Sequence, residues 1–139
     1  CFAGSNTTNL LNLFMKDTSA GASHNSIGSS SNQFGEFDVN GFQSVIAIKL
    51  DDLNQIEGVP SPNHIKLDVD GKELEILEGA SNILSEVDSI LVEMEGINLD
   101  ENLEKIENII FMAGLEEELS WRNKGSRRNR LYLRKYSNE

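Results

Sequence analysis

The sequence predicts an α/β fold in which strands and helices alternate along the chain. In residues 64–80 the apolar positions first alternate with polar ones and then, after Gly71, follow the spacing of an amphipathic helix. In residues 89–114 a continuous apolar run at 90–92, typical of a buried parallel strand, leads into a second amphipathic helix that Gly114 ends. The order strand, helix, strand, helix favours parallel pairing, and two further strands close the chain as an antiparallel hairpin.

The other elements follow from local composition. Ser, Gly and Asn dominate residues 19–33, which predicts a flexible loop in which the lone His24 is solvated. Asp70 and Glu73 have the three-residue spacing of a capping box, and a similar pair precedes the second helix. In chain order the predicted elements are a strand ending at residue 3, a short strand within 6–18, a strand at 42–50, a helical turn at 51–56, a strand at 65–70, a helix at about 72–85, a strand at 89–95, a helix starting near Asn98, and strands at 115–121 and 130–134.

Length and composition limit what the chain can be. Its 139 residues suit one domain, and the net charge of −11 argues against non-specific nucleic-acid binding, which depends on a basic surface. No apolar run reaches the ~20 residues that a membrane span needs. Cys1 is the one cysteine, so it forms neither an internal disulfide nor a thiolate metal site, which favours a reducing, cytoplasmic compartment.

Carboxylates gather where the two predicted strands before the helices end. Asp68, Asp70 and Glu73 mark the first strand end and Glu93 the second, and we take these four as candidate catalytic residues. Ligands of open α/β sheets bind outside the carboxyl ends of strands, where carboxylates act as general bases, hold substrates or bind hard metal ions. Helix capping also explains Asp70 and Glu73, but it does not explain Asp68, which alternates to the same side as Lys66.

Three other patterns carry less weight. The Asp-Val-Asp-Gly run at 68–71 is not a calcium loop, because Leu77 would occupy a position that requires an oxygen ligand. Seven of the twelve Lys and Arg lie between Arg122 and Lys135, a cluster that we expect to be a solvated hairpin rather than an anion site, with Trp121 in the core. The sequence contains no Gly-x-Gly-x-x-Gly turn, no P-loop and no evident Ser/His/Asp set, and we assign no metal ligands.

Residues 65–80 resemble the signature of the FkbM family of S-adenosylmethionine-dependent methyltransferases, which runs roughly I-K-I-D-V-E-G-A-E-x-x-V-L-x-G-A. Residues 48–53 are similar to the family's preceding T-L-D-x-L segment, 90–93 to its following I-L-V-E segment, and 129–135 to its closing strand. The resemblance covers roughly residues 42–135.

This resemblance implies a class I (Rossmann-like) methyltransferase fold, with a mostly parallel sheet and helices on both faces. It implies that Asp68 ends the fourth strand beside the cofactor and the transferred methyl group, and that Glu93 ends the fifth. The implied cofactor is S-adenosyl-L-methionine. The implied partner is a small-molecule acceptor whose hydroxyl, on a sugar, lipid or polyketide, receives the methyl group, with Asp68 as base or orienter.

The chain departs from the family pattern at several points. Asp70 stands where the family has Glu, and Lys72 replaces a small residue. The family's Asp-x-Gly-Ala-Asn-x-Gly turn and the acid after its second strand are absent, so we expect the N-terminal strands of the fold to be missing. The chain is then a single partial domain, with a strand and flexible loop in 1–41 and the C-terminal half of the sheet in 42–139.

Two consequences are expected from a partial domain. Alone, the chain should bind S-adenosyl-L-methionine weakly and be inactive, because the main glycine-rich site is not in it. The strand at 65–70 should present an unpaired edge, which promotes self-association.

Two other classes of function stay open. A chain without the cofactor-binding half would be a non-catalytic interaction module. A metal-binding module would instead use Asp68, Asp70 and Glu93 around a divalent ion. A glycine-rich turn encoded upstream of Cys1 would favour the methyltransferase.

Overall fold

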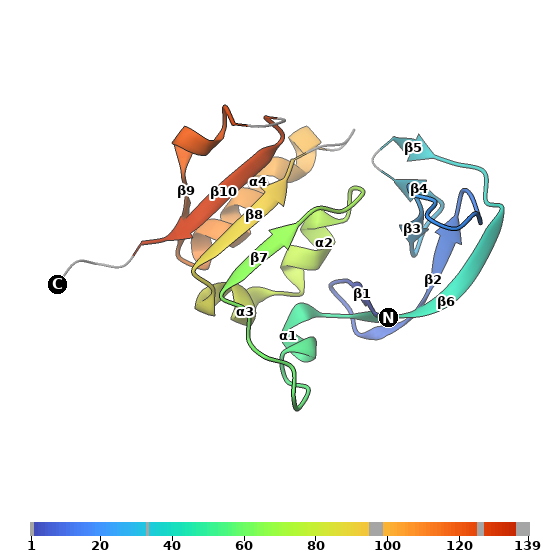
Figure 1. The fold of residues 1–139 in the computed structure, drawn as a ribbon, viewed down its shortest axis with the longest axis horizontal. Helices are drawn as coiled ribbons and strands as arrows, with labels where there is room; N and C mark the ends of the chain where they lie inside the picture. The colour runs from blue at the N-terminus through green and yellow to red at the C-terminus, as the bar shows by residue number, and fades with distance from the viewer. Residues whose placement is uncertain (1, 33, 95–98, 125–126, 136–139) are drawn as a thin grey trace.

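The computed structural model describes residues 2–32, 34–94, 99–124 and 127–135 of the chain. Two four-stranded sheets lie next to each other, and the helices pack on the second sheet (Figure 1). The chain is therefore a mixed α/β protein, as its sequence predicts.

The first sheet is built mainly from a long antiparallel pair. Its strands are β1 (Phe2–Gly4), β2 (Asn9–Met15), β3 (Ser26–Ile27) and β6 (Gly41–Ile48), in the order β1-β6-β2-β3. β6 pairs with β2 over seven residue pairs and runs parallel to β1. A separate two-stranded sheet joins β4 (Ser31–Asn32) to β5 (Gly35–Glu36). The stretch predicted as a loop thus contains β3 and β4.

The second sheet holds the strands that follow in the sequence. They are β7 (His64–Leu67), β8 (Ser89–Glu93), β9 (Leu115–Glu117) and β10 (Asn129–Arg134), in the order β7-β8-β10-β9. β7 and β8 are parallel, and the closing hairpin of β9 and β10 is antiparallel as predicted. The mostly parallel sheet is not confirmed. Among the described residues two strand pairs are parallel and five are antiparallel.

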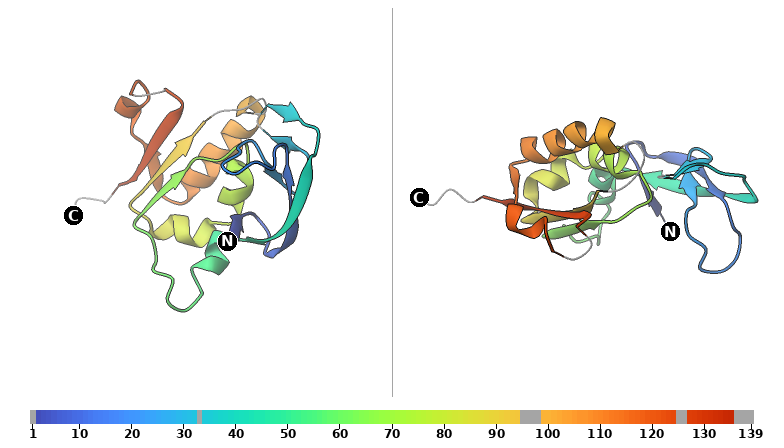
Figure 2. Two further views of the ribbon diagram at one scale, coloured as in Figure 1. Left: turned by 45° about the vertical axis from the view of Figure 1, so that its right-hand side comes forward. Right: turned by 90° about the horizontal axis from the view of Figure 1, so that it is seen from above.

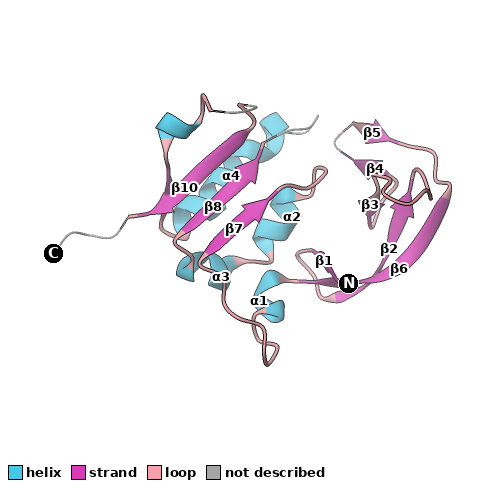
Figure 3. Cartoon of the chain, viewed as in Figure 1, coloured by secondary structure: helices cyan, strands magenta, loops and turns pink. Residues whose placement is uncertain are grey.

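The helices are α1 (Leu50–Leu53), α2 (Glu73–Glu78), α3 (Ser81–Glu86) and α4 (Leu99–Met112), followed by the 3-10 turn η1 (Leu119–Trp121). The helices α2, α3 and α4 lie on one face of the second sheet, as the view from above shows (Figure 2), and Figure 3 distinguishes all helices from the strands. Their apolar faces meet the sheet in one core, in which Leu77, Leu84, Val87, Ile90, Val92, Ile110 and Leu115 are fully buried. In the parts of the chain that are described, no helix is long and apolar enough to cross a membrane.

The helix predicted at 72–85 is interrupted between α2 and α3. A β-carbon on Gly79 would lie 2.2 Å from the carbonyl oxygen of Ser5, so the chain after β1 occupies the space that a side chain would need. Asp51, in α1, then caps the new helix, because its carboxylate accepts hydrogen bonds from the amides of Asn82 and Ile83 at 3.0 Å. The interruption is therefore caused by contacts from elsewhere in the chain.

Other predicted boundaries also shift. The strand predicted at 42–50 ends at Ile48 because α1 begins two residues later, and the strand predicted at 65–70 ends at Leu67. The strand predicted at 115–121 ends at Glu117, where η1 takes over. The predicted cap at Asn98 lies outside the described residues. The predicted helix stop is confirmed, since α4 ends two residues before Gly114, which has a φ of 82°.

Arg134, near the end of β10, connects the last strand to the helix layer. Its guanidinium donates hydrogen bonds to three main-chain carbonyls, those of Val87 at 2.8 Å, Ala113 at 3.0 Å and Leu84 at 2.7 Å. These carbonyls lie at the carboxyl ends of α3 and α4, where a cation also complements the helix dipole.

Substituting Gly79 with Ala should destabilise the fold, because the new methyl group would collide with the Ser5 main chain rather than with a movable side chain. We expect the free energy of unfolding to fall by about 1–3 kcal/mol in urea denaturation, the usual cost of overpacking. Glu86→Ala, an exposed change in α3, is the matched control. An unchanged denaturation midpoint for Gly79→Ala would contradict the close approach.

The exposed edge of the second sheet generates another prediction. Among the described residues β7 pairs with β8 alone, so its other side presents unpaired main-chain groups. Such edges pair with other chains, and we predict dimers that form through β7 as concentration rises. Sedimentation velocity over a hundredfold dilution series tests this, and a monomer at every concentration would exclude it.

Candidate active site

Two carboxylates meet where the parallel strands β7 and β8 end. Leu67 is in register with Val92, so Asp68 and Glu93 follow as neighbours on adjacent strands. Their side chains lie within hydrogen-bonding reach of each other. The two acids that the sequence places at the ends of successive strands are thus neighbours in the structure.

Lys66 determines the charge of Asp68. The Lys66 ammonium lies 2.5 Å from a carboxylate oxygen of Asp68, and both side chains are open to solvent. This hydrogen bond, supported by the one to Glu93, lowers the pKa of Asp68 below its ordinary value. Asp68 is therefore held in its ionised form. Its predicted position on the same side as Lys66 is confirmed.

Glu73 occupies the opposite kind of environment. It opens α2, is only 8% exposed, and accepts a hydrogen bond from the Gly71 amide at 3.3 Å. Burial raises the pKa of Glu73, and the negative charges of Glu93 and Asp70 add to the rise. The strand–helix junction thus combines one carboxyl group whose pKa is lowered with another whose pKa is raised.

The capping box predicted for Asp70 and Glu73 is wrong. α2 begins at Glu73, and Lys72 is its N-cap without a capping side chain. Asp70 instead accepts a hydrogen bond at 3.2 Å from the main-chain amide of His24. The carboxylate that appeared to belong to a local motif therefore holds the loop between β2 and β3 against the turn that follows β7.

Three of the seven cations of the basic cluster pair with nearby acids. Its pairs are Arg122 with Glu117 at 2.5 Å, Arg130 with Glu107 at 2.6 Å, and Lys135 with Glu116. The Arg122 guanidinium lowers the pKa of Glu117. Trp121 is half-buried, and the Lys124 ammonium lies 4.8 Å from the centre of its ring. Trp121 is therefore neither a core residue nor an open stacking surface. These contacts agree with the structural interpretation of the cluster.

The metal-binding alternative has no support from geometry. Across the described ranges, no group of three or more His, Cys, Asp or Glu side chains is arranged to hold a metal ion. The acids at the strand ends can instead accept hydrogen bonds from hydroxyl or ammonium groups and receive a proton.

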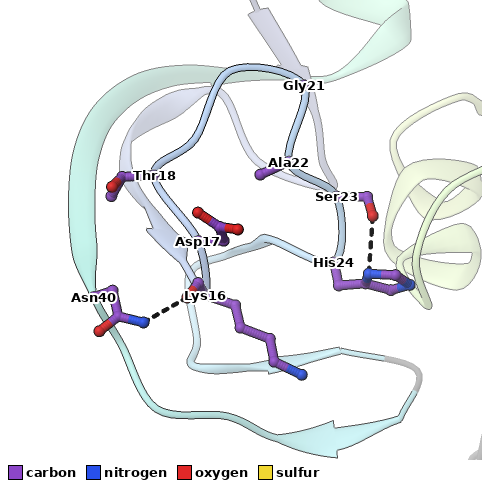
Figure 4. Close-up of a pocket in the computed structure, with 8 residues that line it drawn as sticks. All are labelled: Lys16, Asp17, Thr18, Gly21, Ala22, Ser23, His24 and Asn40. Atoms are coloured by element: carbon purple, nitrogen blue, oxygen red, sulfur yellow. Dashed lines mark hydrogen bonds between the residues drawn. The ribbon is translucent and has the colours of Figure 1, made fainter.

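Sequence reasoning missed the partner of Asp70. His24 is 46 residues from Asp70 in the sequence and lies in the loop predicted to be solvated. The centre of its ring is 5.1 Å from that of the Phe34 ring, and its Nδ1 is 2.9 Å from the Ser23 hydroxyl. The same loop borders a polar hollow (Figure 4). The only local signal was composition, which does not report such a contact.

Comparison with known proteins gives a consistent assignment. The Methyltransferase FkbM domain matches residues 2–126. The hexuronic acid methyltransferase AglP of Haloferax volcanii is 41% identical over 54 residues, which are 39% of this chain and 23% of that protein. The chain therefore matches less than a quarter of the length of this relative. No solved structure shows a significant match to the chain.

The buried carboxyl of Glu73 gives a pH-dependent prediction. Because burial raises its pKa above the ordinary 4.5, the folded chain holds this proton to higher pH than the unfolded chain does. The resulting stability is complete below pH 4.5 and is lost as pH rises through the folded-state pKa. We expect Glu73→Gln to raise the melting temperature at pH 7 and to change it little at pH 4.

The control for Glu73→Gln is Glu104→Gln, an exposed substitution in α4. It should leave the melting temperature unchanged at both pH values. If Glu73→Gln lowers stability at pH 7, the ionised carboxylate is a stabilising group and the assignment of its environment is wrong.

Proposed function

Because the chain belongs to the FkbM methyltransferase family, we propose that it forms part of an S-adenosyl-L-methionine-dependent enzyme that methylates a sugar hydroxyl. The observation that carries this proposal is the Lys66-paired carboxylate of Asp68 at the end of a parallel strand, with Glu93 against it. The name of the Haloferax volcanii relative, a hexuronic acid methyltransferase, supports a sugar as the acceptor.

The described residues could hold only part of the proposed cofactor. Carboxylates at the strand ends can accept hydrogen bonds from its ribose hydroxyls or its ammonium group, and Asp68 is the most accessible candidate. The sequence lacks the glycine-rich strand-to-helix turn that would hold the remainder. Weak binding by residues 1–139 alone therefore stays a prediction.

When bound, S-adenosyl-L-methionine supplies an electrophilic methyl group on a positively charged sulfur. On the acceptor side, Asp68 would receive a hydrogen bond from the sugar hydroxyl and orient its oxygen. Methylation of the hydroxyl oxygen would release the hydroxyl proton, and the Asp68 carboxylate would receive it. Lys66 keeps Asp68 ionised before the transfer.

The other acids have positioning roles in this proposal. Glu93 holds the Asp68 side chain by a hydrogen bond, and Asp70 fixes the loop that carries His24. Glu73 supports the turn through the Gly71 amide. None of the three needs to contact the reacting atoms.

Asp68→Asn tests the proposal because it keeps the shape of the side chain and removes its ability to take a proton. In the full polypeptide that contains this sequence, we expect the rate of methyl transfer to a sugar to fall about 100-fold or more, the usual contribution of a general base. Glu104→Gln should keep the parent rate. Transfer of labelled methyl from S-adenosyl-L-methionine is the measurement.

Two outcomes would count against this function. An Asp68→Asn rate within a few fold of the parent would remove Asp68 from the chemistry. Absence of both cofactor binding and methyl transfer in the full polypeptide would favour the non-catalytic interaction module instead.

A further inference from the structure

A polar hollow of about 820 Å³ opens beside the loop between β2 and β3, on the first sheet (Figure 4). The side chains that give it its chemistry are Lys16, Asp17, Thr18, Ser23, His24 and Asn40. Its only apolar lining comes from small residues, so a lipid tail or an aromatic ring would find little surface to bury against.

Several of these polar groups have hydrogen-bonding capacity left. Asn40 donates its amide to the Lys16 carbonyl at 2.6 Å, which leaves its own carbonyl oxygen available. The Ser23 hydroxyl lies 2.9 Å from Nδ1 of His24, which leaves Nε2. Within the described residues the Lys16 ammonium and the Thr18 hydroxyl have no side-chain partner. The hollow thus offers both donors and acceptors, as a ligand rich in hydroxyl groups requires.

The charges around the hollow restrict the ligand further. Lys16 is the one Lys or Arg in residues 1–48. Asp17 lies beside it, with one oxygen held by the Ser19 amide at 2.8 Å, and Glu36 and Asp38 line an adjoining hollow of about 510 Å³. The Lys16 ammonium can pair with one carboxylate, and the three nearby acids repel a phosphate dianion about twice as strongly as a single negative charge. A sugar with at most a single negative charge is the ligand class that fits.

One rim residue of the hollow contacts the turn next to the candidate active site. Its rim residue His24 donates its main-chain amide to Asp70 at 3.2 Å, so the loop contacts the turn that carries the strand-end acids. Ligand held beside Lys16 would therefore lie on the part of the first sheet that is fastened to that turn.

We propose that this hollow is the acceptor subsite, in which Lys16 meets the carboxylate of an acidic sugar while Thr18 and Asn40 hold its hydroxyls. The proposal rests on the proposed function only where it calls the bound sugar the acceptor of the methyl group. Sugar binding itself requires neither a cofactor nor methyl transfer. The sugar subsite and the methyltransferase function can therefore fail separately.

The test is a titration of the ¹⁵N-labelled chain with methyl glucuronide, methyl glucoside and inorganic phosphate, followed by amide chemical shifts. We expect saturable shifts with the glucuronide at residues 16–24 and 40, weaker binding of the glucoside, and no saturable shifts with phosphate. Lys16→Gln should weaken glucuronide binding about two- to fivefold, the range for an exposed ion pair, and change glucoside binding less. Thr18→Val should weaken both sugars.

Lys105→Gln, which removes another exposed lysine from α4, is the matched control and should bind like the parent. The proposal is overturned if neither sugar shifts these amides, if phosphate alone does, or if Lys16→Gln binds the glucuronide as tightly as the parent. Sugar binding at the hollow without methyl transfer by the full polypeptide would retain the subsite and reject the proposed function.

Discussion

The approach of the Ser5 main chain to Gly79 is the constraint on which the arrangement of the two sheets depends. No side chain fits at Gly79, since its β-carbon would be 2.2 Å from the Ser5 oxygen. A β-carbon on Gly4 would lie 3.2 Å from the side chain of Ile76, one helical turn before Gly79, so the end of β1 lies close against α2. Two small residues thus allow the first sheet to pack on the helices of the second.

That packing brings distant parts of the chain to the strand ends. The loop after β2 reaches the turn after β7, where the His24 amide meets Asp70. The acids on this turn then differ in environment over a few residues. Asp68 is exposed and paired with Lys66, whereas Glu73 is buried, and the pKa values of the two carboxyl groups move in opposite directions. Opposite pKa shifts within one small region are a recurrent property of catalytic sites.

Long-range hydrogen bonds complete elements that the local sequence leaves unfinished. α3 obtains its N-terminal acceptor from Asp51, in α1, rather than from a residue of its own. Its carboxyl end, with that of α4, obtains donors from Arg134 on the last strand. Short helices of six residues are marginal by themselves, so their stability depends on these partners and on the shared core.

The sequence by itself determined the alternation of strands and helices, the closing hairpin, the helix stop near Gly114 and the meeting of Asp68 with Glu93, because periodicity and strand order report which residues share a face or an edge. The tertiary structure decided the break at Gly79, the role of Asp70, the burial of Glu73 and the balance of parallel and antiparallel pairs. These four features depend on Ser5, His24, Asp51 and other groups tens of residues away in the sequence. A local sequence pattern carries no information about which distant groups will contact it.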